Sequence, residues 1–345
     1  MSTIFDQPLV HQLEEHHTLW NNEYEPKILK DVIGNQMIAE TLEGFLKSDI
    51  PNLLFCGPNG CGKTTMAKIL VHEYLGKQYD HHSHLRIIGS IYRGKNVVSE
   101  KTDKKTANDS NDVPNINNFI RKKSLLPAGK CRIVTIYDFE CMTNEAQMAL
   151  RRIIELHCQK VRFIFICNNL GKVIEAIQSR TLILRFQPIP SEEIDQRIKV
   201  IARDKGRVFP EDIFEAITLM ANGDLKQAIN YLQVFSHNRE VTLESFYHIF
   251  NIPSFQCINE IITTCLSGQG PKAFVVLGRL VDNGYNVTDI LEIMIKLLLQ
   301  NKKITEEQRV LMVEEIIKVI TANEQVPSVL HLYKLLVAVI NKNQI

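Results

Sequence analysis

Apolar residues in the first half of this chain fall into short dense runs, separated by stretches with helical spacing. Short apolar runs rich in β-branched residues are typical of buried strands, and a spacing of three to four residues is typical of helices. The strand-like runs lie at residues 52–56, 86–88, 132–136, 161–167 and 182–186. The helical patterns lie at 32–47, 64–74 and 143–156. Strands that alternate with helices predict an α/β fold, in which a parallel sheet carries helices on both faces.

The pattern changes after Pro190, because from there on the apolar positions follow helical spacing alone. Ser191 is well suited to cap a helix that runs to Lys205, and residues 211–235 predict two further short helices. From about residue 240 one helical pattern follows another. We therefore predict three domains, which are an α/β domain over residues 1–188, a small helical domain over 189–238 and an all-α domain over 239–345.

One glycine-rich segment lies directly between a strand-like run and a helical pattern. Residues 57–64 read Gly-Pro-Asn-Gly-Cys-Gly-Lys-Thr, which matches the G-x-x-x-x-G-K-T phosphate-binding loop. In such a loop the backbone N–H groups and the helix N-terminus surround the phosphates, Lys63 reaches the β- and γ-phosphates, and Thr64 binds Mg²⁺. A plain glycine turn would not explain the Lys-Thr pair. The residues predicted to contact the nucleotide are Gly57, Pro58, Asn59, Gly60, Cys61, Gly62, Lys63, Thr64 and Thr65.

Composition narrows the class of protein further. The 345 residues are 45% hydrophobic and carry a net charge of +1, so a packed core is expected and the overall charge does not indicate nucleic-acid binding. No apolar stretch is long enough to cross a membrane, and the eight cysteines include no Cys-x-x-Cys pair. These features favour a cytosolic or nuclear compartment with reduced thiols.

Contact with nucleic acid would need a local basic surface. The run Arg121, Lys122 and Lys123 is one candidate, although such a run is as often a solvated surface. Arg151 and Arg152, on a predicted helix, form the other candidate.

Two polar segments carry no clear chemistry. His81, His82 and His84 suggest a metal site, but a surface loop is the stronger expectation because no fourth ligand has suitable spacing. Residues 99–115 are rich in Lys, Asp, Asn, Ser and Thr, and we expect them to form an exposed insertion.

Several further motifs stand in one order along the chain, at residues 23–27 (EYEPK), 32–36 (VIGNQ), 162–168 (RFIFICN), 177–180 (IQSR) and 223–226 (GDLK). With them the chain, from about Leu19 to Lys342, resembles the small subunits of replication factor C, a sliding-clamp loader of the AAA+ ATPase family. The resemblance implies an α/β P-loop AAA+ domain, followed by a small helical lid and an all-α collar. Glu25 stands where family members usually carry Arg.

The resemblance assigns roles to individual residues. Asn168 takes the sensor-1 position, which orients the attacking water, and Arg180 takes the position of an arginine finger that serves the next subunit's nucleotide. Lys226 stands at sensor 2, where the usual Arg would offer a bidentate fork that Lys lacks. Arg151 and Arg152 match positions near DNA, although neighbouring residues on a helix do not face the same phosphate.

The family's Asp-Glu-Ala-Asp motif, which supplies a metal ligand and the residue that polarises water, is altered in this chain. In an alignment without a gap, Tyr137 falls at the metal-binding Asp and Asp138 at the Glu. In an alignment shifted by one residue, Asp138 holds the metal and Phe139 takes the place of the base. Glu140 shares a face with Asp138 only if the strand continues that far. A base misplaced by about 1 Å loses ~100-fold in rate, so we expect Mg²⁺ and ATP to bind, with Thr64 and Asp138 as metal ligands, and hydrolysis to be weak.

The resemblance implies a subunit of a heteropentameric clamp loader, which uses ATP to open a PCNA-like sliding clamp and load it onto primer–template DNA together with other clamp-loader subunits. Two alternatives stay open: a non-catalytic nucleotide-binding scaffold in the same complex, and another AAA+ DNA-replication ATPase. A helicase-like hexamer or an origin-binding initiator would be expected to carry a basic winged-helix tail, whereas residues 242–345 are helical and not basic. The expected location is the site of DNA replication, in the nucleus or the cytosol.

Overall fold

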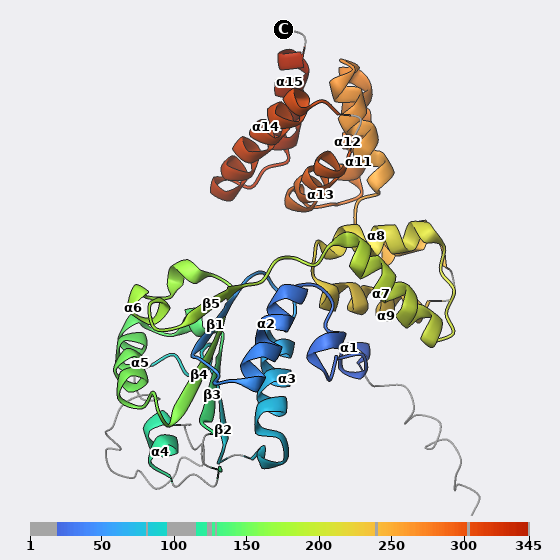
Figure 1. The fold of residues 1–345 in the computed structure, drawn as a ribbon. Coiled ribbons are helices and arrows are strands. Elements are labelled where there is room, and N and C mark those ends of the chain that lie inside the picture. The colour runs from blue at the N-terminus through green and yellow to red at the C-terminus, as the bar shows by residue number, and fades with distance from the viewer. Residues whose placement is uncertain are drawn as a thin grey trace, which may run out of the picture. The chain divides into compact units, whose positions relative to one another are not determined.

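The computed structural model shows the chain as two compact units (Figure 1). The first unit comprises Met1–Val208 and Met220–Gln233, and the second comprises Phe209–Leu219 and Val234–Ile345. The residues that the structure describes are 19–80, 82–94, 115–122, 126–127, 130–238, 241–301 and 304–343. The division into three domains, with boundaries at 188 and 238, stays a prediction.

Three of the expectations fall outside the described residues. The insertion at 99–115 does so apart from Asn115, and so do His81 and Lys123. Their roles stay predictions.

The first unit is built on a five-stranded parallel sheet with the strand order β2-β3-β4-β1-β5. The strands are β1 (Leu53–Cys56), β2 (His84–Ile88), β3 (Arg132–Tyr137), β4 (Val161–Cys167) and β5 (Leu182–Arg185). The five predicted strands and their parallel arrangement are thus confirmed. Because β1 lies between β4 and β5, the loop that follows Cys56 leaves the sheet beside Cys167, which is the register partner of Cys56.

Helices cover both faces of this sheet, as Figure 1 shows. On one face lie α2 (Gln36–Lys47) and α3 (Lys63–Leu75), and on the other lie α4 (Ile116–Arg121), α5 (Asn144–Leu156) and α6 (Glu175–Gln178). Successive strand residues point to opposite faces, so β1 sends Leu53 and Phe55 into the core beside α2 and α3, and Leu54 into the core beside α4 and α5. Each face of the sheet therefore has its own buried apolar core.

One predicted helix start and one predicted N-cap are wrong. The helix expected from residue 32 begins at Gln36, because Gly34 (φ 72°) and Asn35 (φ 54°) adopt left-handed backbone conformations that interrupt a helix. Ser191 is the first helical residue of α7 (Ser191–Asp204), and Pro190 precedes it as the N-cap with extended backbone. Ser191 therefore does not take the N-cap position, and no side-chain hydrogen bond caps the start of α7. The start of α5 agrees with prediction, since the Thr143 side chain accepts a hydrogen bond from the backbone N–H of Ala146.

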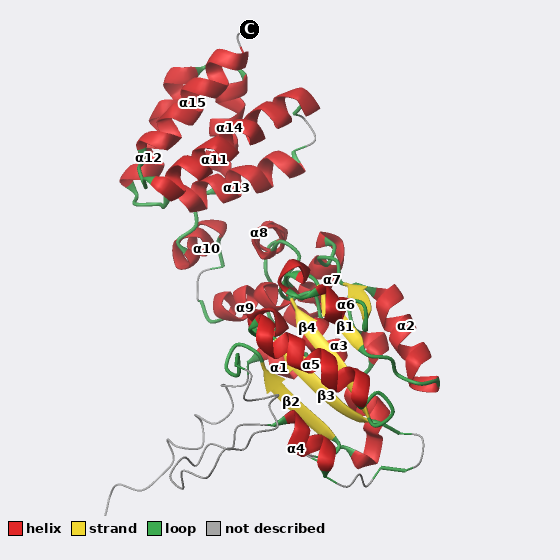
Figure 2. Ribbon diagram, turned by 90° about the vertical axis from the view of Figure 1, so that its left-hand side faces the viewer, coloured by secondary structure: helices red, strands yellow, loops and turns green. Residues whose placement is uncertain are grey.

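The remaining regular elements are helical in the described part of the chain (Figure 2). The helices are α1 (Trp20–Glu23), α8 (Glu211–Ala221), α9 (Leu225–Ser236), α10 (Leu243–Phe250), α11 (Phe255–Leu266), α12 (Gly270–Asp282), α13 (Val287–Gln300), α14 (Glu306–Gln325) and α15 (Leu330–Asn343). Short 3₁₀ turns occur at Leu29–Asp31, Gly76–Gln78, Phe139–Cys141 and Leu170–Lys172. Among the helices described here, none combines the length and the apolar character that a bilayer crossing requires.

Candidate functional site

A cavity of about 420 Å³ lies where β1, β3 and β4 end, entirely within the first unit. In parallel α/β sheets ligands bind outside the carboxyl ends of the strands, so this is the expected place for a site. The polar and charged residues that line it are Asn21, Asn22, Tyr24, Glu25, Asn59, Lys63, Thr64, Thr65, Lys68, Asp138, Asn168, Asp224 and Lys226. Apolar walls come from Pro26, Val32, Ile33, Ile166, Ile189, Leu225 and Ile229.

The phosphate loop runs from the end of β1 to the first residue of α3, and its shape depends on glycine. Gly60 has φ 67°, and a Cβ atom there would lie 1.8 Å from an Asp224 carboxylate oxygen. A Cβ atom at Gly57 would lie 2.5 Å from the carbonyl oxygen of Phe186. No larger residue fits either position without displacing its neighbour. Both glycines therefore allow close approaches, of the loop at Gly57 to the backbone of Phe186 and of the loop at Gly60 to the carboxylate of Asp224.

Lys63 is the first residue of α3 and is almost fully buried. Its ammonium group donates hydrogen bonds to the carbonyl oxygens of Gly57, at 2.8 Å, and Pro58, at 2.5 Å. The loop therefore curls around this positive charge at the N-terminus of a helix of 13 residues, and the helix dipole adds to the charge. The neighbouring Cys61 thiol is buried, which raises its pKa and keeps it neutral at physiological pH.

The structure brings most of the predicted nucleotide-site residues together at this cavity. Of the predicted residues, those that line it are Asn59, Gly60, Gly62, Lys63, Thr64, Thr65, Asp138, Asn168 and Lys226. Gly57, Pro58 and Cys61 belong to the same loop but do not line the cavity. A hydroxyl from Thr64 and a carboxylate from Asp138 are oxygen ligands of the kind that Mg²⁺ prefers. The lysines, the glycine loop and these oxygens fit a nucleoside triphosphate with its metal ion.

Asp138 follows the last residue of β3 and has a left-handed backbone conformation, with φ 49°. One carboxylate oxygen accepts a hydrogen bond from the Ser90 hydroxyl at 3.0 Å. The strand ends at Tyr137, so Glu140 lies in a 3₁₀ turn and does not share a strand face with Asp138. Tyr137 packs against the α3 side of the sheet and does not line the cavity, and burial raises its pKa, so its phenol is neutral.

Glu140 connects the ends of β3 and β4. Its Oε1 atom accepts a hydrogen bond from the backbone N–H of Asn168 at 3.1 Å, and its buried Oε2 atom has no hydrogen-bond partner among the described residues. Glu140 thus holds the backbone at Asn168, a contact that sequence reasoning missed. The sequence shows Glu140 as a second acidic residue beside Asp138, but only the 3₁₀ turn shows which backbone group it contacts.

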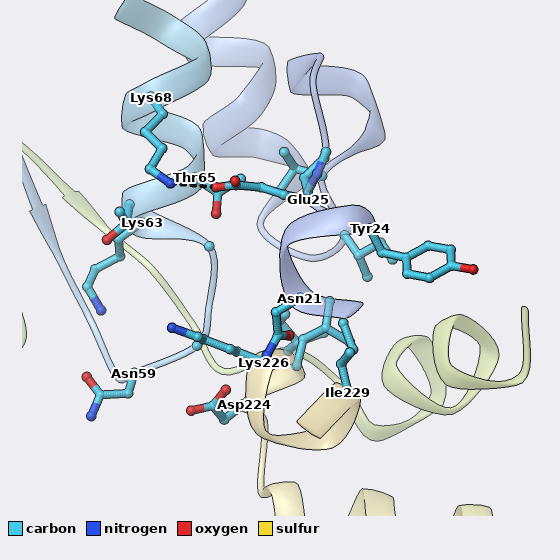
Figure 3. A pocket seen from close by; sticks show the side chains of 18 of the residues that line it. Asn21, Tyr24, Glu25, Asn59, Lys63, Thr65, Lys68, Asp224, Lys226 and Ile229 are labelled. Atoms are coloured by element: carbon cyan, nitrogen blue, oxygen red, sulfur yellow. Dashed lines mark hydrogen bonds and ion pairs between the residues drawn. The ribbon is translucent and has the colours of Figure 1, made fainter. Parts of the chain in front are cut away.

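The start of α9 closes one side of the cavity. Asp224 accepts a hydrogen bond from the backbone N–H of Gln227 at 2.9 Å, and its carboxylate lies against Gly60. Lys226 and Asp224 extend toward the side of the cavity where Asn59 and Lys63 lie (Figure 3). The positive charge of Lys226 therefore faces the glycine-rich loop.

The other end of the cavity carries an ion pair that the sequence did not predict. Lys68 in α3 contacts Glu25 with 2.8 Å between the ammonium nitrogen and a carboxylate oxygen (Figure 3). Glu25 occupies the position where the resemblance leads one to expect Arg. The positive charge near Pro26 and Val32 thus comes from Lys68 in α3 and not from an arginine at position 25.

The predicted finger and DNA-contact residues lie apart from this cavity. Arg180 follows α6, and Arg151 and Arg152 are exposed on α5, on the opposite face of the sheet from α3. Glu155 in α5 contacts both Arg180, at 2.6 Å, and Arg151, at 3.3 Å. Sequence reasoning did not single out Glu155, because its two partners come from different elements.

The histidine segment is not a surface loop throughout. His84 is the first residue of β2 and is buried, with its Nε2 atom 3.0 Å from the Thr135 hydroxyl oxygen. Burial lowers its pKa to about 4, with the positive charge of Arg86 as the next cause. The expectation of a surface loop is therefore wrong for His84, while His82 is exposed. Within the described ranges, no group of three or more His, Cys, Asp or Glu side chains is arranged to hold a metal ion.

Comparison with known proteins relates most of the chain to the small subunits of replication factor C. A family described as DNA polymerase III, delta subunit, matches residues 36–190, and the replication factor C C-terminal domain matches residues 253–322. The replication factor C small subunit of Aeropyrum pernix is 33% identical over 296 residues, which cover 85% of this chain and 86% of that protein. The probable replication factor C subunit 2 of Dictyostelium discoideum is 31% identical over 299 residues, which cover 86% of this chain and 84% of that protein.

The fold also resembles a solved structure of low sequence similarity. The Thermotoga maritima RuvB Holliday junction branch migration motor has a TM-score of 0.50 and 17% identity, over 70% of this chain and 78% of that chain. At this identity the likeness concerns the fold alone. It agrees with the α/β P-loop AAA+ architecture expected from the sequence, which is confirmed.

Proposed function

We propose that this chain, which belongs to the replication factor C small-subunit family, acts as a subunit of a sliding-clamp loader. In this proposal it binds ATP with Mg²⁺ in the cavity of the first unit. It assembles with the other large and small clamp-loader subunits, and with them it loads a PCNA-like clamp onto primer–template DNA. Its place of work is the site of DNA replication, in the nucleus or the cytosol.

The observation that supports ATP binding most directly is the convergence of Lys63, Asp138 and Asn168 on one cavity, from the ends of β1, β3 and β4. Lys63 would bind the β- and γ-phosphates, and Thr64 and Asp138 would hold Mg²⁺, which neutralises negative charge on the phosphates. Asn168 would orient water near the γ-phosphate. Lys226 would add a second positive charge from α9.

Weak hydrolysis at this chain's own site follows from its carboxylates. Among the residues that line the cavity, Glu25 is paired with Lys68 and Asp224 caps α9, which leaves Asp138 as the acidic residue at the end of a central strand. Glu140 has turned toward the backbone of Asn168. One carboxylate would have to serve both the metal and the attacking water. This favours a subunit that binds ATP and turns it over slowly, which is close to the description of a non-catalytic scaffold.

Arg180 would serve the nucleotide of the next subunit. It lies away from its own cavity, and its side chain is 31% exposed, so a neighbouring subunit can reach it. An arginine supplied in this way stabilises the charge that develops during phosphoryl transfer and contributes ~10³- to 10⁵-fold in rate. Arg151 and Arg152, both exposed on α5, would contact the DNA backbone without reading its sequence.

The proposal is tested first on the isolated chain. A fluorescent ATP analogue should bind to the chain, and Lys63→Ala should abolish binding, whereas ATP turnover by the isolated chain should be close to zero. Lys160→Ala, an exposed lysine near the start of β4, is the control and should bind normally. If the isolated chain does not bind the ATP analogue, the proposed function is wrong.

The second test uses the assembled complex with its partner subunits. Arg180→Ala should lower steady-state ATP turnover at least tenfold, whereas Lys63→Ala in this chain should have a smaller effect, because its own site contributes little turnover. Equal losses from Lys63→Ala here and from the same change in a partner with an intact acidic pair would show that this site hydrolyses ATP normally.

A further inference from the structure

Glu155 joins the two arginines to which the proposed function assigns different ligands. Its Oε1 atom accepts a hydrogen bond from Nε of Arg180 at 2.7 Å and lies 2.6 Å from a terminal nitrogen of the same guanidinium. The same oxygen accepts a hydrogen bond from Nε of Arg151 at 3.3 Å. The contacts from Arg151 and then Arg180 hold the pKa of Glu155 below its ordinary value, so the carboxylate is ionised at neutral pH.

Arg180 is held on its other edge as well. Its NH1 group donates hydrogen bonds to the carbonyl oxygen of Ala176, at 2.9 Å, and to the hydroxyl of Ser179, at 3.0 Å. A guanidinium has five N–H groups in a rigid plane, so these contacts and those to Glu155 set the direction of the plane. One N–H of the NH2 group stays available to an incoming ligand. The contacts of Arg180 thus hold this N–H in a fixed direction, in which it can donate a hydrogen bond to a phosphate that another subunit binds.

We propose that Glu155 is a positioning residue, which orients Arg180 toward the neighbouring subunit's nucleotide and does so most fully once DNA has taken Arg151. The inference rests on the proposed function, which assigns Arg180 to that nucleotide and Arg151 to a DNA phosphate. Without DNA, the two guanidinium groups share one carboxylate oxygen. A DNA phosphate competes for Arg151, and the whole carboxylate is then left to Arg180.

The exposure of these groups makes such an exchange feasible. The side chains of Arg151 and Glu155 are 45% and 43% exposed, so their ion pair contributes little to stability and can change partners without disturbing the fold. The Arg180 contact is shorter, involves two nitrogens and is less exposed. Charge-assisted contacts with two nitrogens are stronger and more directional. Arg151 is therefore the partner that leaves, and Arg180 is the partner that stays.

The test compares variants in the assembled complex, with kcat and KM for ATP measured with and without primed DNA. Glu155→Ala should lower the DNA-stimulated kcat about 10-fold with little change in KM, since a misplaced catalytic group costs up to ~100-fold. Glu155→Gln should lower it less, because the amide oxygen still accepts a hydrogen bond from Arg180. Arg151→Gln should weaken DNA binding and yet raise the kcat measured without DNA, because Glu155 is then free for Arg180.

If Glu155 had only a structural role, Glu155→Ala would not lower kcat while Arg151→Gln raises the kcat measured without DNA. Glu145→Ala, an exposed carboxylate in the first turn of the same helix, is the control and should leave both values unchanged. Thermal unfolding of each isolated chain checks that the fold is intact. If Arg180→Ala leaves kcat unchanged, the finger in the proposed function is wrong. If Arg180→Ala lowers kcat but Glu155→Ala does not, or if Arg151→Gln lowers the DNA-independent kcat, the positioning inference is wrong and the proposed function stands.

Discussion

Gly60 is the residue at which the phosphate loop and the start of α9 come closest. Its backbone has φ 67°, and the Asp224 carboxylate occupies the space that a side chain at this position would need. Asp224 in turn caps α9 through the backbone N–H of Gln227, so one glycine serves both the loop and the helix that carries Lys226. A change at this position should therefore affect phosphate binding and the placement of α9 together.

We predict that Gly60→Ala weakens binding of a fluorescent ATP analogue at least 10-fold. The left-handed conformation costs a residue with a Cβ atom about 1–2 kcal/mol, and Asp224 must also move. Gly44→Ala is the matched control, because Gly44 lies inside α2 with no atom within 4 Å of the added Cβ. That change should stabilise the chain by about 0.5–1 kcal/mol in urea unfolding and leave binding unchanged. Normal binding by Gly60→Ala would contradict the tight approach seen here.

The Glu25–Lys68 pair leads to a prediction about charge at the other end of the cavity. Lys68→Glu should weaken ATP binding about 3- to 10-fold, because two carboxylates then repel each other and the phosphates across an exposed site. Exchanging both residues, Glu25→Lys with Lys68→Glu, should restore most of the affinity, since the pair forms again with its charges reversed. A titration of the single and double variants measures this. If the double variant binds no better than Lys68→Glu alone, the pair does not act as a unit.

At the scale of elements, local signals were predictable and long-range partners were not. β4 was predicted with its observed bounds because six of its seven residues are apolar and buried, which is typical of a central strand. The phosphate loop was predicted because its spacing is local. The start of α2 at Gln36 was missed because it depends on the left-handed backbone of Gly34 and Asn35, and the N-cap of α7 was missed because Pro190 and not Ser191 takes that position. Lys68 was missed as a partner because it meets Glu25 only after the chain folds.

The hydrogen-bond partners of buried polar residues were likewise not predictable from local sequence. Gln147 lies on the buried face of α5, where spacing alone predicts an apolar contact. Its amide donates hydrogen bonds to the carbonyl oxygens of Met142 and Lys172, and it accepts one from the backbone N–H of Ile174. These bonds join the start of α5 to the segment that leads from β4 to α6. No pattern within α5 reveals partners more than 20 residues away, because they become neighbours only after the chain folds.

His84 makes the contact between β2 and β3 sensitive to pH. Its folded-state pKa is about 4, whereas an unfolded histidine has a pKa of about 6.5. Between these two values the His84 imidazole is protonated in the unfolded chain and neutral in the folded chain. The free energy of unfolding therefore falls as pH drops from about 6.5 to about 4, and this group causes no further loss below pH 4. The loss between pH 7 and pH 5 should be about 2 kcal/mol, at 1.36 kcal/mol for each pH unit below 6.5.

Urea unfolding at pH 7 and pH 5 measures this loss. His84→Gln should reduce the difference between the two pH values by about that amount, since glutamine cannot titrate. His82→Gln, at the exposed neighbour, should keep the original pH dependence. An unchanged pH dependence in His84→Gln would mean that other groups cause it.

At the scale of the whole molecule, the two units carry separate determinants of stability. Every residue that lines the nucleotide cavity belongs to the first unit. In the second unit Glu315, almost buried in α14, accepts hydrogen bonds from Lys318 at 2.9 Å and from Lys342 at 2.7 Å, and the second of these ties α15 to α14. A ligand of the cavity and a change at Glu315 should therefore act on different parts of the chain.

Calorimetry of the full chain should resolve this as two unfolding transitions. ATP with Mg²⁺ at 100 times its dissociation constant should stabilise one transition by about 2.7 kcal/mol. Glu315→Ala should lower the other by about 1–2 kcal/mol, because it removes two charge-assisted hydrogen bonds from a poorly solvated carboxylate. Glu314→Ala, at the preceding residue, which is exposed, accepts a hydrogen bond from Lys318 and lies 3.9 Å from the Lys342 ammonium, should shift that transition much less. If ATP and Glu315→Ala both moved a single transition, the units would unfold together, and nucleotide binding would then stabilise the helical unit as strongly as the sheet.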